Sequence, residues 1–346
     1  ADPCLYIKVN PDNPTQMLML LIYVDDVICA SNWQAAEESL VTQLSQNFNV
    51  KHLGELKWFL GIEVEHNPSA GTIRISQPQY IEHMLKRFGF WGAKPQSTPA
   101  DPNVPLTNLP STHVDSPDQQ KEVQQFPYRE VIGSLMYAAC VTRPDIAATV
   151  GFLARAMSNP KHVHVTAAKR CLRYLKGTQN LGITYCKSEE NQELMGYSDS
   201  NWAGDDERKS TSGYCFMLSQ GPISWGSKKQ RSVALSSCEA EYYAASLATQ
   251  EAIWLRNLLA ELQHGSKGAT EIKEDNTGCI RLSKDPCSHA KSKHIEVRHH
   301  FVRDQVQMGK VNLVYIPTAE NVADVFTKVL GKAKHTQFVA KLMSSK

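Results

Sequence analysis

The order of strand and helix patterns in the last third of the chain constrains the fold more than any other feature. Short apolar strand patterns separated by polar turns come first, and a long helical pattern follows them. In chain order, the patterns are three strands at about 195–197, 213–218 and 222–225, a helix at about 238–262, a strand that leads to Asp275, helices over about 276–308, a strand at 311–316 and a helix from about 320 onward. This alternation predicts an α/β fold in which a mixed sheet is covered by helices.

Acidic residues occupy the places where such a sheet could bring side chains together. Asp199 ends the first strand pattern, Asp275 closes the strand before Asn276, and Asp324 lies in the final helical pattern. Acidic residues at strand ends and at a helix start can converge at one edge of a sheet, where the ligands of open α/β sheets bind. We therefore expect these three carboxylates to lie close together.

The long helical pattern offers two further carboxylates, Glu239 and Glu241, and helical geometry separates them. At about 100° per residue, Glu241 shares a stripe with apolar residues that recur every three or four positions. These residues are Ala245, Ala248, Ala252, Leu255 and Leu259. Glu239 points about 200° away, toward solvent. Glu241 is thus predicted to face the sheet.

Such a cluster would need cations, because carboxylates at close range cannot all stay ionised without them. Hard oxygen ligands suit magnesium or manganese. Two such ions, about 3.5–4 Å apart, could activate a water and stabilise the leaving oxygen of a phosphodiester. Surface Asp and Glu are nevertheless common and mostly solvated, so the spacing alone leaves both interpretations open.

The first part of the chain has a different character. Residues 17–30 form two apolar runs interrupted by Asp25 and Asp26, which predicts a β-hairpin. Adjacent Asp residues in a tight turn are more often structural than catalytic. A helix is expected at about 33–46, followed by strands at 56–64 and 72–76.

The middle of the chain reads as helical. A short helix is expected at 80–88, then a polar linker at about 95–125, then helices over 128–177. Near 165–176, an apolar stripe opposes a basic one made of Lys169, Arg173 and Lys176, which could follow a phosphate backbone or simply be solvated. A second basic cluster near Trp225 comprises Lys228, Lys229 and Arg231.

Composition sets wider limits. The chain has 346 residues, enough for two or three domains, and its net charge of +2 is too small to indicate a nucleic-acid partner by itself. Nine cysteines, none in a C-x-x-C pair, favour a reducing, intracellular compartment. The longest apolar run, 17–24, is far short of the roughly 20 residues of a membrane span, and no signal peptide is recognised.

Zinc is the main alternative to magnesium and manganese. Cysteine and histidine ligands are concentrated near the end of the chain, at Cys279, Cys287, His289, His294, His299 and His300. Their spacing matches no zinc-finger pattern, so packing roles are favoured for them. Neither a G-x-x-x-x-G-K-[ST] loop nor a G-x-S-x-G elbow is present, which leaves nucleotide hydrolysis and serine hydrolysis unsupported.

The segments around these carboxylates resemble the ribonuclease H domain of copia-type LTR retrotransposon Pol polyproteins. The matching stretches are YSDSNWAG, KSTSGY, ISWGSKKQ, LSSCEAEYYA, EDNTGCIRLSKDP, KSKHIEVRHHFVRDQV and YIPTAENVADVFTK. The upstream part resembles the end of the reverse transcriptase of the same polyproteins. That likeness rests on LLIYVDDVICAS, similar to the YxDD hairpin, and on HLGELKWFLGIEV, YREVIGSLMYAACVTRPDIA and AAKRCLRYLKGT.

The resemblance implies an organisation and a set of roles. It implies a partial reverse transcriptase palm at 1–76, a thumb or connection region at 77–190, a ribonuclease H domain at 193–330 and a basic tail at 331–346. The ribonuclease H domain would be a mixed sheet with helices on both faces. Catalytic and metal-binding roles pass to Asp199, Glu241, Asp275 and Asp324. Metal binding at the hairpin passes to Asp25 and Asp26, and nucleotide contact to Lys57.

Two departures from the family pattern matter. Many ribonucleases H have a mobile His shortly before the last Asp, and none lies between Tyr315 and Asp324. A polymerase also needs a second carboxylate from an earlier strand, whereas only 24 residues precede Asp25 and none resembles that motif. Polymerisation by this chain alone is therefore not expected.

The expected function is hydrolysis of the RNA strand of RNA–DNA hybrids during reverse transcription, with two Mg²⁺ ions for which Mn²⁺ could substitute. The expected partners are RNA–DNA hybrid, DNA and the upstream part of the reverse transcriptase. The resemblance implies an intracellular, cytoplasmic location in virus-like particles, and a nuclear phase is compatible with it. The alternative is a non-catalytic nucleic-acid-binding remnant of a decayed element.

Overall fold

The computed structural model describes residues 2–107, 114–187, 193–266, 268–284 and 296–345. The chain divides into two compact units. Unit 1 comprises 1–57 and 253–267, and unit 2 comprises 58–252 and 268–346. In the parts of the chain that the structure describes, no helix is both long enough and apolar enough to cross a membrane.

Unit 1 contains an antiparallel sheet of three strands in the order β1-β2-β3, with one helix after it. The elements are β1 (Leu5–Val9), β2 (Met17–Tyr23), β3 (Asp26–Ser31) and α1 (Gln34–Asn47). The small core joins Leu18 and Leu20 of the sheet to Ala36 of the helix. Tyr23 pairs with Asp26 across the turn, so the predicted hairpin is confirmed.

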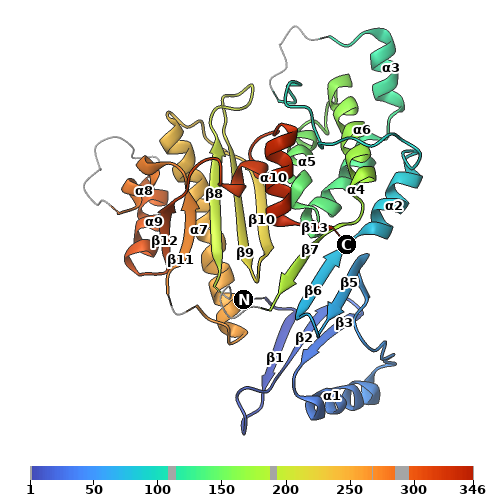
Figure 1. Cartoon of the computed structure of the whole chain (residues 1–346), viewed down its shortest axis with the longest axis vertical. Coiled ribbons are helices and arrows are strands. Elements are labelled where there is room, and N and C mark those ends of the chain that lie inside the picture. The colour runs from blue at the N-terminus through green and yellow to red at the C-terminus, as the bar shows by residue number, and fades with distance from the viewer. Residues whose placement is uncertain (1, 108–113, 188–192, 267, 285–295, 346) are drawn as a thin grey trace. The chain divides into compact units, whose positions relative to one another are not determined.

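The first sheet of unit 2 has five strands in the order β10-β9-β8-β11-β12 (Figure 1). Its strands are β8 (Met195–Asn201), β9 (Thr211–Leu218), β10 (Gly221–Lys229), β11 (Thr270–Glu274) and β12 (Val311–Tyr315). The first three are antiparallel neighbours, whereas β11 runs parallel to both β8 and β12. The predicted mixed sheet is therefore present.

Helices cover both faces of this sheet. Leu313 of β12 packs with α7 (Ser237–Glu261), α8 (Thr277–Lys284) and α9 (Glu296–Gln307). Cys215 of β9 packs instead with η2 (Val322–Phe326) and α10 (Lys332–Leu342). The strand register places these two side chains on opposite faces, because Leu313 lines up with Phe216, the neighbour of Cys215. The predicted fold class, a mixed sheet with helices on both faces, is confirmed.

A second sheet of five strands lies in the same unit, in the order β13-β7-β6-β5-β4. Its strands are β4 (Trp58–Phe59), β5 (Ile62–Asn67), β6 (Thr72–Ser76), β7 (Leu181–Cys186) and β13 (Ser344–Ser345). The predicted palm boundary at residue 76 differs from the unit boundary at residue 57, because the edge of β6 pairs with β7 more than a hundred residues later. No strand was expected at β7 or β13.

Helices also form a separate core in unit 2. They are α2 (Pro78–Arg87), α3 (Pro117–Gln125), α4 (Tyr128–Val141), η1 (Pro144–Ile146), α5 (Ala147–Arg155) and α6 (His162–Gly177). Fully buried Leu85, Leu135 and Leu172 belong to this core, and Ala100 and Leu106 of the predicted linker join it. Helix α3 lies in that linker, where a loop was expected.

The end of the chain differs from expectation in two ways. The helix predicted from Glu320 is a 3₁₀ turn, η2, and the predicted basic tail forms helix α10. One face of α10 buries His335, Phe338, Val339 and Leu342. Since Phe338 packs with Cys215 of β9, this helix is part of the fold and not an appendage.

Candidate functional site

Two neighbouring parallel strands supply the first two carboxylates of the site. Asp199 lies in β8, and Asp275 follows directly after β11. Lys273 of β11 pairs with Tyr197 of β8, so the same register two residues further on sets Asp275 beside Asp199. Asp199 is only 1% exposed, whereas Asp275 is half-buried.

Helix α7 supplies the third carboxylate. Glu241 is 8% exposed, and four of the five apolar residues that share its stripe, Ala245, Ala248, Ala252 and Leu255, are buried as predicted, whereas Leu259 is half-buried. Glu239, two positions earlier, instead accepts a hydrogen bond from the backbone N–H of Leu235 at the start of the helix. The helical periodicity therefore selected the carboxylate that faces inward.

The carboxylates of Asp199, Glu241 and Asp275 converge, because one oxygen from each lies within 4.8 Å of the others. Glu241 Oε2 is buried and has no hydrogen-bond partner among the described residues. Burial, followed by repulsion from Glu274 and Asp199, raises the pKa of Glu241 to about 11. The fold thus concentrates negative charge that these residues do not balance among themselves.

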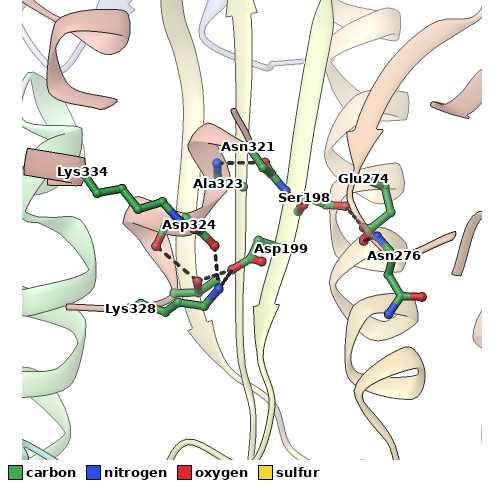
Figure 2. Close-up of polar contacts among 10 residues, drawn as sticks. Ser198, Asp199, Glu274, Asn276, Asn321, Ala323, Asp324, Lys328 and Lys334 are labelled. Carbon is green, nitrogen blue, oxygen red and sulfur yellow. Dashed lines mark hydrogen bonds and ion pairs between the residues drawn. The ribbon is translucent and has the colours of Figure 1, made fainter. Parts of the chain in front are cut away.

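A fourth carboxylate, Glu274, was not predicted for the site. It is completely buried at the end of β11 and accepts a hydrogen bond of 2.6 Å from Ser198 Oγ (Figure 2). Burial raises its pKa well above the usual range, although the Ser198 hydrogen bond opposes the rise. Its position next to Asp275 in the sequence was the available signal, but strand alternation points it to the opposite side.

Asp324 approaches Asp199 from the 3₁₀ turn η2. Asn321 fixes this turn, because its side chain accepts from Ala323 N at 3.1 Å and donates to Ser198 O of β8 at 2.8 Å (Figure 2). Gly213 of β9 allows the close approach, since a Cβ there would lie 2.7 Å from Thr327 Cγ2. Asp324 is completely buried, yet it is not one of the three carboxylates that converge.

Two lysines and a threonine contact the Asp324 side of the site. Lys328 Nζ lies 2.6 Å from Asp324 Oδ1 and 3.6 Å from Asp199 Oδ2 (Figure 2). Lys334 Nζ forms an ion pair with Asp324 Oδ2, and Thr327 Oγ1 donates to Asp199 Oδ2. None of these three was predicted as a site residue, although Lys328 belongs to the YIPTAENVADVFTK stretch.

The lysines affect the carboxylates electrostatically. Burial raises the pKa of Asp199 to about 7; Lys328 opposes the rise, and Asp324 adds to it. Burial lowers the pKa of Lys328, but Asp199 and Asp324 outweigh this effect, so the net shift is upward and the ammonium stays charged. The two halves of the site therefore differ: Asp324 contacts both lysines, whereas among the three converging carboxylates the ion pair with Lys328 involves Asp199.

The predicted metal ligands of the hairpin lie in unit 1. Asp25 is in the turn after β2, Asp26 begins β3, and both are exposed. Over the described ranges, Asp199, Glu241 and Asp275 are the only three acidic, His or Cys residues found close enough together to hold an ion. Metal binding by Asp25 and Asp26 stays a prediction.

The side chains of the basic stripe of α6 contact other residues of unit 2. Lys169 forms an ion pair with Glu122, and Arg173 Nε donates to Lys94 O at 2.7 Å. The ammonium of Lys176 lies 3.4 Å from the ring centroid of Trp91. The opposite stripe of Ala168, Cys171, Leu172 and Leu175 is buried, as predicted. Nucleic-acid binding by the basic stripe stays a prediction.

The basic cluster after Trp225 is divided between paired and exposed side chains. Lys229 forms ion pairs with Asp205 at 2.6 Å and with Glu207 at 3.0 Å. Lys228 at the end of β10 and Arg231 after it are exposed. These two side chains are therefore better placed for an external phosphate than Lys229.

Half of the residues of the zinc alternative, namely Cys287, His289 and His294, fall outside the described residues. Cys279 lies in α8 and is completely buried in the core with Tyr242. The converging site itself consists only of carboxylates, and hard oxygen ligands fit Mg²⁺ or Mn²⁺ better than zinc. The partnerless Glu241 oxygen and the unbalanced charge agree with a divalent ion.

Comparison with known sequences identifies the chain. Residues 2–102 match the family described as "Reverse transcriptase (RNA-dependent DNA polymerase)". The chain is 40% identical over 337 residues to the Pol polyprotein of transposon TNT 1-94 from Nicotiana tabacum, and the match covers 96% of the chain and 25% of the polyprotein. The chain thus spans about a quarter of the length of this relative.

A shorter relative and a solved structure add to this comparison. The putative transposon Ty5-1 protein YCL074W from Saccharomyces cerevisiae is 32% identical over 249 residues, and the match covers 71% of the chain and 77% of that protein. A structure of LC11-RNase H1 in complex with RNA/DNA hybrid is 15% identical, covers 40% of this chain and 96% of its own, and has a TM-score of 0.31. On the sequence relationships, the chain belongs to the family of copia-type retrotransposon Pol polyproteins.

Proposed function

We propose that this chain hydrolyses the RNA strand of RNA–DNA hybrids with divalent ions held by the buried carboxylates of unit 2. The observation that carries the proposal is the convergence of Asp199, Glu241 and Asp275 within 4.8 Å, with Glu241 Oε2 buried and without a hydrogen-bond partner in the described part of the chain. Membership of a Pol polyprotein family supports the substrate class, because RNA-dependent DNA synthesis leaves an RNA–DNA hybrid.

The chain's own residues would position the reaction. Asp199, Glu241 and Asp275 would hold an ion, and Asp324 would complete the set of four that the family resemblance assigns to two ions. Bound Mg²⁺ or Mn²⁺ would supply an activated water and charge stabilisation for the leaving oxygen. Asn321 and Thr327 hold the backbone of η2 and the Asp199 carboxylate in fixed positions. Pre-set ligands of this kind lower the cost of reaching the reactive geometry.

Recognition of the hybrid is expected to depend on shape. A-form-like duplexes are read mainly through phosphates and 2′-hydroxyls, with little sequence preference. Exposed Lys228 and Arg231 support phosphate contact. The expected products carry a 3′-hydroxyl and a 5′-phosphate. For polymerisation, we propose that Asp25 and Asp26 act only together with an upstream part of the reverse transcriptase.

A cleavage assay tests this function. The full chain would be incubated with an RNA–DNA hybrid labelled on the RNA strand, with Mg²⁺ or with EDTA, beside the Asp199→Asn variant. We expect RNA cutting only with the wild-type chain and Mg²⁺, and no cutting of a DNA–DNA duplex. Binding of the hybrid without cutting, with Mn²⁺ also tried, would favour the non-catalytic remnant over the enzyme.

A further inference from the structure

The charge on the two halves of the site suggests a role for Lys328. Asp324 contacts the ammonium groups of Lys328 and Lys334, and Lys328 also lies near Asp199. The other converging carboxylates, Glu241 and Asp275, lie on the side away from these contacts with Asp324. The chain therefore already provides, through its lysines, positive charge on the side where a second divalent ion would bind.

Geometry distinguishes the two lysines. Lys328 Nζ lies between the two carboxylates, 2.6 Å from Asp324 Oδ1 and 3.6 Å from Asp199 Oδ2. Lys334 contacts Asp324 Oδ2, and its ammonium also lies 5.3 Å from the ring centroid of Phe338. An ion shared by Asp199 and Asp324 would need the position that Lys328 occupies, whereas Lys334 could stay in place.

Lys328 is able to leave this position. Its side chain is 33% exposed, although the carboxylates that it contacts are almost completely buried. A flexible four-carbon stem that reaches solvent can withdraw its ammonium without disturbing the backbone of η2. The contact is thus a displaceable one, unlike the hydrogen bonds through which Asn321 fixes the same turn.

We propose that Lys328 is a built-in cation that occupies the position between Asp199 and Asp324, so that one divalent ion binds tightly and a second binds only by displacing it. The inference rests on the proposed function for the identity of the site. It concerns an arrangement within this chain: an ammonium holds the two carboxylates together until a second ion enters. Removing Lys328 should therefore strengthen binding of the second ion.

Mn²⁺ binding to the full chain without nucleic acid tests the proposal. Bound ions would be counted by electron paramagnetic resonance of free Mn²⁺ in the wild type, Lys328→Met and the matched control Lys334→Met. We expect one tight ion in the wild type. In Lys328→Met, the second ion should bind at least about tenfold more tightly, because a unit charge and an obstacle are both removed. Lys334→Met should give a smaller gain.

The outcomes separate this inference from the proposed function. Two equally tight ions in the wild type, or identical binding in the wild type and Lys328→Met, would overturn the role of Lys328 and leave the metal-dependent nuclease intact. Absence of Mn²⁺ binding in every variant would overturn both. Circular dichroism would check that each variant is folded.

A second measurement needs no substitution. Lysine acetylation of the wild-type chain, read by mass spectrometry, would be followed as Mn²⁺ rises. Labelling of Lys328 should increase in the concentration range where the second ion binds, while labelling of Lys334 stays constant. A Lys328 reactivity that does not change over this range would contradict displacement.

Discussion

Two groups of carboxylates in this chain were both predicted to bind metal, and their environments differ sharply. Asp25 and Asp26 lie exposed at the turn of the hairpin in unit 1. Asp199 and Glu241 in unit 2 are buried beside further carboxylates, and one oxygen of Glu241 has no hydrogen-bond partner among the residues that the structure describes. Burying a charge without a partner is costly, so such carboxyl groups stay protonated until a cation supplies the missing charge. The comparison favours the buried cluster of unit 2 as the metal site.

The largest expected effect concerns Glu241 and Glu239, two similar residues on one helix. Glu241→Gln removes an inward-facing ligand, and we expect RNA hydrolysis to fall by at least about a hundredfold, since ligand loss removes several kcal/mol of transition-state stabilisation. Glu239→Gln keeps the length of the side chain that accepts the hydrogen bond from Leu235 N and should retain near-normal rates. Single-turnover cleavage of a labelled hybrid measures both. Equal losses in the two variants would remove the distinction between the two residues.

Stability without metal should also depend on the buried cluster. The pKa of Asp199 is raised to about 7, so between about pH 4 and pH 7 the folded chain binds more protons than the unfolded chain. In EDTA, the free energy of unfolding should therefore decrease as pH rises through this window, by on the order of 2–4 kcal/mol.

Thermal and urea unfolding between pH 5 and pH 8 would measure this dependence. Asp199→Asn should flatten the profile, because the amide stays neutral, and Mg²⁺ should restore stability at the upper end. Asp25→Asn is the matched control from the exposed pair and should leave the profile unchanged. A metal-free stability that increases with pH across the window would contradict the account.

The smallest expected effect extends the comparison to basic side chains. Exposed Lys228 and Arg231 should each contribute to hybrid affinity, and Lys228→Ala or Arg231→Ala should lower the salt dependence of binding by about one unit of slope. Lys169, which is paired with Glu122, should contribute little, so Lys169→Ala should leave the slope unchanged. Filter binding at several salt concentrations would show the difference. A larger change in the slope for Lys169→Ala than for the other two variants would indicate that Lys169, and not Lys228 or Arg231, contacts the phosphates.

Local patterns predicted most of the first sheet of unit 2 and the inward direction of Glu241. The periodicity of α7 identifies its buried face, and the strand patterns around Asp199 and Asp275 place those residues at neighbouring positions. The helical periodicity and the strand patterns are both local, so they can be recognised in short stretches of sequence. The same is true of the hairpin at 17–30.

Some elements were missed although their signals were present. The polar linker contains Ser116 and Gln119, which form the capping box that begins α3, and Pro117 at the first helical position. The basic tail has His335, Phe338, Val339 and Leu342 at helical spacing, which is the buried face of α10. Here polarity and charge were given more weight than periodicity.

Other features depend on contacts between distant segments and could not be read from local patterns. The second sheet requires β6 to pair with β7, and β7 with β13 at the end of the chain. At the site, the spacing of four between Asp324 and Lys328 is a helical ion-pair spacing, but nothing local connects Lys328 with Asp199. Only the folded structure therefore reveals that the Lys328 ammonium lies close to both Asp324 and Asp199.

The most direct test of the central claim is the affinity for Mn²⁺ of three forms of the full chain: wild type, Asp199→Asn and Asp25→Asn. If the buried cluster holds the metal, Asp199→Asn should lose the tight ion, while Asp25→Asn should bind it as the wild type does. Tight binding that survives in Asp199→Asn but disappears in Asp25→Asn would show that the hairpin, and not the buried cluster, is the metal site.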